Sequence, residues 1–286
     1  MDADEARRAL ASVGMDPGRI EPVLGGWANW TFEVDSKWIA RFPRNAEVAA
    51  AAAREQALLP ELSSHVSFQV PAPTHEGTWS AMPFMVYRRI EGVPLTSRRP
   101  GPGCIRAIGE MLAELHSFPL ERATRLLQTP PAHRAWSEYW EDLWPIVEEE
   151  ALPAMSPGLA GSVSRNYERF LAGMPGFEPA LVHHDLGLEH ILVDAELDAP
   201  RGLIDFEDAW VGDPAIDYVP LRAALGEAGM GLLLESRDLG EELDRRMWSY
   251  RWMGSIHAII YGVREGNDQE LASGLAELPR RLHNYP

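Results

Sequence analysis

The segment ALVHHDLGLEHILVD (residues 180–194) sets three histidines and an aspartate between two short hydrophobic runs. These side chains are His183, His184, Asp185 and His190. Histidine and aspartate in one segment suit a metal site, a catalytic loop with a general base, or a polar turn between buried strands. The residues that follow help to choose between these three interpretations.

A second hydrophobic run, GLIDFED (residues 202–208), follows after a turn at 198–202. We predict that this run pairs with residues 191–194 as a β-hairpin. The hairpin would bring Asp205, at the end of its strand, close to the loop that holds Asp185 and His190. Two carboxylates and an imidazole can bind a divalent cation and still leave one carboxylate free as a base.

The two stretches HHDLGLEHILVD and LIDFEDAWVGDPAIDY resemble the catalytic segment of the aminoglycoside and macrolide phosphotransferases, which are relatives of the protein and choline kinases. Those enzymes carry H-x-D-x4-N, then a second aspartate, then G-D-P-x-x-D, in the order found here. The resemblance implies an α+β fold with two lobes: a small antiparallel-sheet N-lobe and a larger, mostly helical C-lobe. It also implies a kinase that transfers the γ-phosphate of ATP or GTP to a hydroxyl group.

Carried over to this chain, the resemblance makes Asp185 the catalytic base and Asp205 a ligand of Mg²⁺. His190 stands where most of the family has asparagine, and macrolide phosphotransferases are similar in having histidine there. Imidazole offers a nitrogen instead of the oxygen that Mg²⁺ prefers, so His190 either binds the metal directly or contacts a metal-bound water. His183 matches a packing residue of the family, and we assign it a structural role.

Outside this segment the sequence indicates three parts. The predicted elements of the first part are a helix at 3–13, a hairpin at 30–43, a helix at 46–59, and strands at 68–73 and 83–90. We predict a nucleotide-binding lobe at 1–90, a hinge or linker rich in glycine and proline at 91–103, and a helical lobe with the acceptor pocket at 104–286. In the helical lobe Trp136, Trp140 and Trp144 recur every four residues, which is typical of a core-facing stripe.

The cation that binds the nucleotide phosphates is either Lys37, the only lysine, or Arg41. Strand alternation places both on one face with Ile39. Lys37 follows the turn directly and is expected to reach solvent, whereas Arg41 lies within the strand. The order of Ile39 and Arg41 resembles the V-A-I-K motif of kinases with arginine in the lysine position, and Glu55 would be the helix partner of Arg41.

Further nucleotide-binding residues are implied by the same resemblance. Gly25 and Gly26 would let the backbone approach the phosphates, with Asn29 following them. Ile39 would face the base, and Tyr87, Arg88, Arg89 and Ile90 match the hinge that contacts the purine edge. The backbone direction at the hinge cannot be seen in the sequence, so ATP and GTP both remain open as donors.

The composition limits the classes of partner. The net charge of −17 and the isoelectric point near 4.9 argue against nucleic acid, whose phosphates need a basic surface. A single cysteine, Cys104, fits a reducing compartment. The acidic N-terminus lacks the apolar core of a signal peptide, and no apolar run approaches the roughly 18 residues of a membrane span. We therefore predict a cytoplasmic protein that binds neither nucleic acid nor membrane; the sequence does not distinguish a monomer from a dimer.

The acceptor is expected to be an antibiotic-like small molecule, which would make this an antibiotic-resistance kinase. Abundant acidic residues in the second lobe, Glu207 and Asp208 among them, favour a cationic aminoglycoside. A macrolide would instead contact apolar side chains such as Trp248, Trp252 and Met253, and a metabolite such as homoserine or choline also stays open. Two other functions compete: a metallohydrolase that uses the His/Asp cluster, and a pseudokinase that binds nucleotide without turnover.

Overall fold

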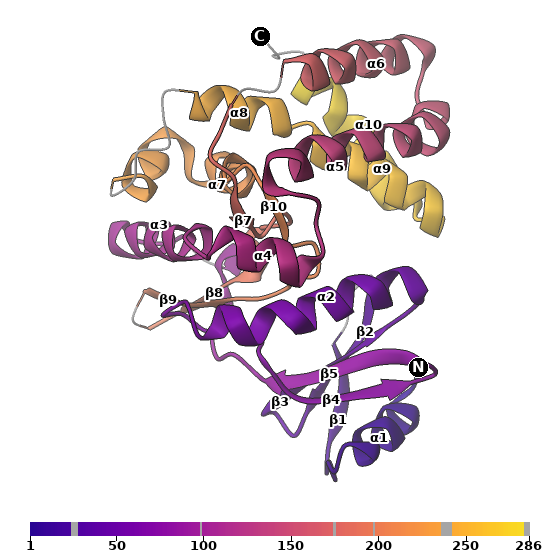
Figure 1. Ribbon diagram of the computed structural model, residues 1–286, viewed down its shortest axis with the longest axis vertical. Coiled ribbons are helices and arrows are strands. Elements are labelled where there is room, and N and C mark those ends of the chain that lie inside the picture. Colours follow the sequence, from indigo (N-terminus) through magenta and orange to yellow (C-terminus); the bar gives the residue numbers. More distant parts are fainter. Residues whose placement is uncertain (24–27, 98, 174–175, 197, 236–241, 283–286) are drawn as a thin grey trace.

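The computed structural model describes residues 1–23, 28–97, 99–173, 176–196, 198–235 and 242–282. The chain forms two lobes, with a strand-rich lobe at one end and a mostly helical lobe at the other (Figure 1). The expected α+β fold is confirmed. No helix in the described ranges is long and apolar enough to cross a membrane.

The N-terminal lobe is built on one antiparallel sheet in the order β1-β2-β3-β5-β4. Its elements are α1 (Ala3–Ser12), β1 (Ile20–Val23), β2 (Asn29–Val34), β3 (Trp38–Pro43), α2 (Ala46–Ser63), β4 (Pro73–Trp79) and β5 (Met82–Arg88). The turn between β2 and β3 holds Asp35 and Ser36 at φ values of 52° and 55°, the geometry of a tight hairpin. The hairpin predicted at 30–43 is therefore confirmed.

Side-chain alternation along β5 separates two hydrophobic clusters. Phe84 and Val86 pack with α1, whereas Met85 and Tyr87 pack with α2 and the second lobe. Arg41 of β3 lies opposite Met85 in the register of the two strands, and directly opposite residues share a face of the sheet. The arginine therefore points toward α2 and the second lobe.

Two predicted elements of this lobe are wrong in their bounds. Residues 68–72 form no strand, because Pro71 has no N–H to donate to a ladder; Gln69 alone bridges to Gly202. The helix predicted to end at residue 59 continues through Pro60 to Ser63. Burial of Leu62 in the core offsets the hydrogen bond that the proline removes.

The second part of the chain is mostly helical. Its elements are β6 (Val93–Pro94), α3 (Pro102–His116), α4 (Leu120–Leu127), α5 (Ala132–Ile146), α6 (Pro157–Ala172), β7 (Ala180–Val182), β8 (Ile191–Asp194), β9 (Ala199–Leu203), β10 (Trp210–Gly212), α7 (Ala215–Leu233), α8 (Leu243–Tyr250), α9 (Met253–Glu265) and α10 (Asp268–Leu282). Short helical turns occur at Leu95–Ser97, Val147–Ala151, Leu152–Ala154 and Leu188–His190. Strand β6, which lies within the predicted linker, pairs with β8.

The opening segment of the sequence lies between two short antiparallel ladders. Strand β7 pairs with β10, and β8 pairs with β9 so that Ile191 lies opposite Leu203. The predicted pairing of the two segments is thus confirmed, but β9 occupies most of the predicted turn at 198–202, ends at Leu203 and leaves Asp205 beyond it. Asp205 has a φ of 71°, outside the extended region, so the strand cannot continue to residue 208 as predicted.

The tryptophan stripe of α5 belongs to the core. Trp136 and Trp140 are 2% and 1% exposed, and their rings meet edge to face at 5.3 Å. Trp252 and Met253 are also buried in this core. These two side chains therefore cannot line an acceptor pocket. The contact with a macrolide that the sequence analysis considers for them is wrong.

Candidate active site

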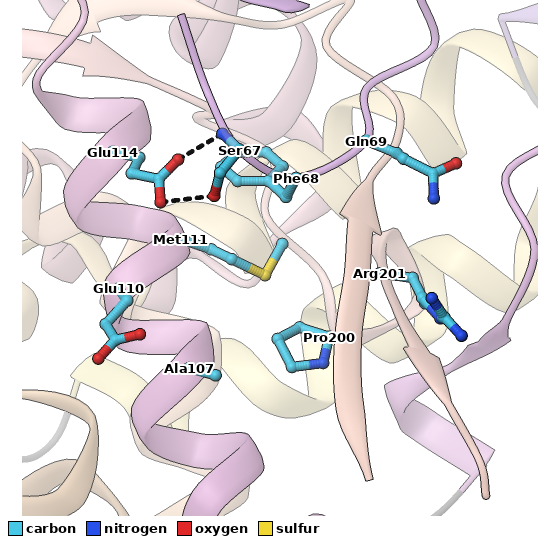
Figure 2. Close-up of a pocket in the computed structure, with 9 residues that line it drawn as sticks. All are labelled: Ser67, Phe68, Gln69, Ala107, Glu110, Met111, Glu114, Pro200 and Arg201. Carbon is cyan, nitrogen blue, oxygen red and sulfur yellow. Dashed lines mark hydrogen bonds between the residues drawn. The ribbon is translucent and has the colours of Figure 1, made fainter. Parts of the chain in front are cut away.

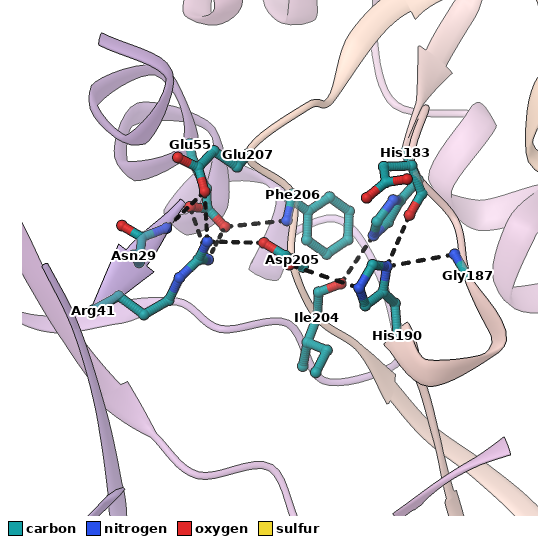
Figure 3. A network of polar contacts seen from close by, with 11 residues as sticks. Asn29, Arg41, Glu55, His183, Gly187, His190, Ile204, Asp205, Phe206 and Glu207 are labelled. Carbon is teal, nitrogen blue, oxygen red and sulfur yellow. Dashed lines mark hydrogen bonds and ion pairs between the residues drawn. The ribbon is translucent and has the colours of Figure 1, made fainter. Parts of the chain in front are cut away.

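Arg41 is the centre of a polar network that joins the two lobes (Figure 3). Its Nη1 atom donates to both carboxylate oxygens of Glu55 on α2, at 2.8 and 3.0 Å. Its Nη2 atom donates to Asp205 and to Glu207, each at 2.8 Å. Arg41 and Glu55 are 8% and 1% exposed. The structure thus brings together Arg41, Glu55 and Asp205, three residues that the sequence assigned to one site.

One guanidinium serves three carboxylates in this network, and the pKa values reflect that imbalance. Burial acts to raise the pKa of Asp205, but Arg41 and then His190 hold it below the usual value. Burial raises the pKa of Glu55 and raises that of Glu207 to about 7, because Arg41 offsets only part of the desolvation. Asp205, whose side chain is 43% exposed, is therefore the member that keeps its charge most readily.

The backbone of the loop that holds Asp185 is itself held by a buried carboxylate. Asp217 of α7 accepts hydrogen bonds from the backbone N–H groups of His183 and His184, at 3.0 and 2.9 Å. The ring of His116, at the end of α3, lies 2.9 Å from the same carboxylate. Asp217 is fully buried. It positions the loop from within the core, and no local pattern in the sequence indicates its partner His116, which is 101 residues away.

His183 and His184 both pack against neighbours. The Nε2 atom of His183 donates to the carbonyl of Ile204 at 2.9 Å, and the ring packs on Phe206 and is fully buried. The side chain of His184 is half-buried, its ring centroid lies 4.7 Å from that of Tyr139, and its backbone φ is 73°.

The ring of His190 has a defined orientation. Its Nδ1 atom lies 2.8 Å from the backbone carbonyl of Asp185, and a carbonyl can only accept, so Nδ1 carries the hydrogen. The amide of Gly187 lies 3.4 Å from Nδ1 and donates at 3.0 Å to that same carbonyl, so the shorter contact decides the tautomer. The Nε2 lone pair of neutral His190 then faces Asp205, whose Oδ2 is 3.6 Å away.

Asp185 lies where the second lobe offers negative charge. Its side chain is exposed, yet surrounding protein weakens its solvation and raises its pKa to about 7. The charge of Asp208 adds to this shift, and His190 opposes it. Asp208 and His257 are likewise exposed and partly desolvated. These groups are accessible and yet lose part of their hydration, which raises the pKa values of the two carboxyl groups.

The residues of the predicted hinge differ in their burial and contacts. Tyr87 and Ile90 are buried, and Ile39 lies opposite Tyr87 across the β3–β5 ladder. Arg89 pairs with Glu33 and Glu91, and its backbone N–H donates to Lys37 at 2.8 Å. Arg88 is exposed.

The remaining candidate nucleotide-binding residues come between β1 and β2 in the sequence and at the start of β2. Gly25 and Gly26 lie outside the described residues. Asn29, which follows them, is buried and donates to Glu207 at 2.7 Å.

Glu207 was grouped with the acceptor-binding carboxylates, and that placement is wrong. It points to Arg41 and Asn29 instead. The available signal was its position two residues after Asp205, because strand alternation places side chains two residues apart on one face, and both carboxylates contact Arg41.

A pocket of about 300 Å³ lies elsewhere, between α3, the segment before β4, and β9 (Figure 2). Its lining residues are Ser67, Phe68, Gln69, Ala107, Glu110, Met111, Glu114, Pro200 and Arg201. None of them belongs to the network around Arg41, so this pocket is separate from the candidate active site.

The fold and the network define a class: a two-lobed, kinase-like phosphotransferase with an Arg–Glu pair in one lobe and an aspartate loop in the other. The chain belongs to the phosphotransferase enzyme family, which it matches over residues 19–283. It is 30% identical over 226 residues to viomycin phosphotransferase of Streptomyces vinaceus, covering 74% of this chain and 76% of that protein.

Two groups of solved structures share the fold. APH(2")-IIIa, an aminoglycoside phosphotransferase solved with GDP and kanamycin, superposes with a TM-score of 0.83 and 24% identity over 97% of this chain and 98% of its own. Macrolide 2'-phosphotransferase type I gives 0.76 and 22% over 97% and 96%. The expectation of a small-molecule kinase is confirmed at the level of the family.

The hydrolase alternative is not supported. Among the residues that the structure describes, no three His, Cys, Asp or Glu side chains are placed to share one metal ion. His183 and His184 make hydrogen bonds to backbone carbonyls instead.

Proposed function

We propose that the protein transfers the γ-phosphate of ATP or GTP to a hydroxyl group of a cationic, antibiotic-like small molecule. The observation that carries this proposal is the buried contact of Arg41 with Glu55 and Asp205, which joins the lobes beside the loop of Asp185. A phosphate-binding cation, its positioning partner and a metal-binding carboxylate are what phosphoryl transfer requires of a protein.

Asp185 acts as the base. Its carboxylate accepts the proton of the acceptor hydroxyl and holds that oxygen in line with the γ-phosphate. The hydrogen bonds that the backbone N–H groups of His183 and His184 donate to Asp217 fix the position of the loop. A pKa near 7 keeps a large part of Asp185 ionised at neutral pH while leaving it basic enough to take a proton.

Asp205 and His190 would hold Mg²⁺. Their facing Oδ2 and Nε2 atoms both carry lone pairs at 3.6 Å, and a cation between acceptors relieves that contact. A ring that donates its other N–H to a carbonyl is typical of a metal-ligating histidine. Mg²⁺ usually takes few protein ligands and completes its shell with water and phosphate oxygens. When bound, it would neutralise charge on the transferred phosphoryl group.

The acceptor is proposed to be cationic because negative charge gathers near the base. Asp208 is exposed close enough to Asp185 to raise its pKa, and the chain as a whole carries −17. Tyr139 and Trp210 lie nearby with ring centroids 5.9 Å apart. Kanamycin in a structural neighbour and viomycin as the relative's substrate support an aminoglycoside-like acceptor, with a macrolide next.

We further propose the division of labour along the chain. Residues 1–90 bind the nucleotide, with Tyr87 to Ile90 at the purine edge; residues 91–103 connect the lobes; and residues 104–286 carry the base and the acceptor site. A nucleotide donor and a single buried cysteine, Cys104, fit a reducing cytoplasmic compartment.

A phosphate-transfer screen with Mg²⁺ and either ATP or GTP over aminoglycosides, viomycin and macrolides tests the proposal. Transfer should occur to at least one acceptor, and Asp185→Asn should abolish it while sparing nucleotide binding. Nucleotide binding without turnover on any acceptor would favour a pseudokinase. Stabilisation by zinc alone, with no nucleotide binding, would favour a hydrolase.

A further inference from the structure

We infer that Glu207 competes with the phosphate groups of the nucleotide for Arg41. The contacts that Glu207 makes between the two lobes must therefore break when the nucleotide binds. This inference rests on the proposed function, because it concerns the same cleft. It starts from a carboxylate that the reaction does not use, two residues after Asp205 and bonded to the other lobe.

Most N–H donors of the Arg41 guanidinium are already engaged with carboxylates, which leaves few for a phosphate. Nη1 is engaged with Glu55, and Nη2 is shared between Asp205 and Glu207 at equal distances of 2.8 Å. Planar bidentate binding is what gives arginine its strength toward phosphate. A nucleotide tail can reach Nη2 only if one of these two carboxylates withdraws.

Of the three carboxylates around Arg41, Glu207 has the least favourable environment. It is 9% exposed, and its Oε2 accepts from both Arg41 and Asn29. Its Oε1 is buried without a hydrogen-bond partner among the described residues. A buried carboxylate oxygen without a hydrogen-bond partner in the protein is costly, so Glu207 gains solvation when it leaves.

The other two carboxylates are better held. Glu55 also accepts the backbone N–H of Phe206 at 3.1 Å and is fixed in α2. Asp205 is more exposed and is the proposed Mg²⁺ ligand, so a cation can offset its charge. Glu207 lies in the irregular segment between β9 and β10, where no ladder restrains it.

The position of Glu207 makes it a link between lobes (Figure 3). Its partner Asn29 begins β2 and Arg41 lies on the neighbouring strand β3, whereas Glu207 comes from the second lobe. Three carboxylates around one cation already carry excess negative charge. Phosphates that enter this site meet like charge from Glu207 unless it moves, and like-charge contact opposes binding.

The test is calorimetric titration of ATP and GTP with Mg²⁺, and of adenosine and guanosine, into wild type and Glu207→Gln. Gln keeps the shape and removes the charge. We expect binding of the preferred triphosphate to tighten about tenfold, which corresponds to about 1.4 kcal/mol, and nucleoside binding to stay unchanged. Glu150→Gln is the matched control, since Glu150 also pairs with an arginine, Arg264, but lies outside the cleft; it should change neither.

Weaker triphosphate binding by Glu207→Gln would overturn the inference and make Glu207 a nucleotide or metal contact. Equal tightening for nucleoside and triphosphate would also overturn it, because competition acts only through phosphate. If Glu207→Gln does not fold, Glu207→Asp is used: the shorter chain cannot span Asn29 and Arg41, so triphosphate binding should tighten by a smaller factor. A wild type that binds no nucleotide at all would instead refute the proposed function.

Discussion

His190 and Asp205 face each other through atoms that both carry lone pairs: the Nε2 atom lies 3.6 Å from Oδ2. The hydrogen bond from Nδ1 to the carbonyl of Asp185 fixes this orientation. The distance is too long for a hydrogen bond and leaves room for a cation that draws both ligands in. A histidine at this position therefore keeps a donor atom directed at Asp205, the proposed Mg²⁺ ligand.

Replacing His190 should reveal whether the ring binds metal. His190→Asn supplies an oxygen ligand and should retain activity with Mg²⁺, whereas His190→Ala should raise the Mg²⁺ concentration needed for half-maximal activity by about 10- to 100-fold. The measurement is activity against free Mg²⁺, and chelation by EDTA should abolish activity in all three proteins. His65→Ala, a change to an exposed histidine, serves as the control. An unchanged metal requirement in His190→Ala would show that the ring contacts no metal.

The pH dependence of transfer should follow Asp185. Desolvation first, and then the charge of Asp208, raise its pKa to about 7. A base works only when ionised, so kcat/KM should fall as the pH drops through about 7. Asp208→Asn removes the larger charge effect and should move this acid limb to lower pH.

Glu189→Gln is the matched control for that experiment, because Glu189 contributes the smallest effect on Asp185. It should move the limb less than Asp208→Asn does. A limb that stays in place in Asp208→Asn would show that Asp185 does not set it.

What the sequence predicted here depends on local chemistry. The Asp35-Ser36 turn marks a hairpin, and three motifs in order mark the catalytic loop, so Asp185, His190 and Asp205 were found together. The spacing of these residues along the chain predicts that they lie close together in space, because they belong to one continuous hairpin and the loop before it. Arg41 and Glu55 were found through the resemblance to the V-A-I-K motif and its helix partner, while strand alternation only placed Lys37, Ile39 and Arg41 on one face.

What could not be predicted depends on long-range packing or on single backbone angles. His116 meets Asp217 across 101 residues, and no local pattern pairs them. The contact of Glu207 with Arg41 spans 166 residues, and no propensity indicates reliably the positive φ of Asp205 that keeps the chain from continuing β9. Trp252 is buried because helices from distant parts of the chain close over it.

Arg41 should matter for stability as well as for nucleotide binding. Arg41→Ala leaves Glu55 and Glu207 buried without a cation, and removing one partner of such a pair costs about 3–5 kcal/mol. Arg41→Lys keeps the charge but cannot donate to three carboxylates in one plane, so the loss should be smaller. Chemical denaturation measures both, and Lys37→Ala, an exposed cation just before the same strand, should be neutral. Equal stability of Arg41→Ala and wild type would mean that the network is not formed in solution.

Asp217 gives the last prediction, because its two oxygens accept three hydrogen bonds. Oδ1 accepts from the backbone of His184, and Oδ2 from the backbone of His183 and from the ring of His116. Asn offers only one accepting atom and turns an NH₂ group toward another donor. Asp217→Asn should therefore lower the free energy of unfolding by about 3 kcal/mol and slow transfer, because the loop of Asp185 loses its support.

The pH profile of stability distinguishes this role from simple packing. Burial acts to raise the pKa of Asp217, but the hydrogen bond and charge of His116 hold it below the usual value. The stability that ionised Asp217 contributes is thus fully present above its unfolded pKa, near 3.8, and is lost as the pH falls through the lower folded value. Unfolding free energies of wild type and Asp217→Asn should differ most at neutral pH and converge in acid. Asp244→Asn, which removes a surface ion pair to Arg222, should change stability by less than about 1 kcal/mol. A difference between wild type and Asp217→Asn that does not shrink in acid would show that packing, and not the carboxylate charge, holds the loop.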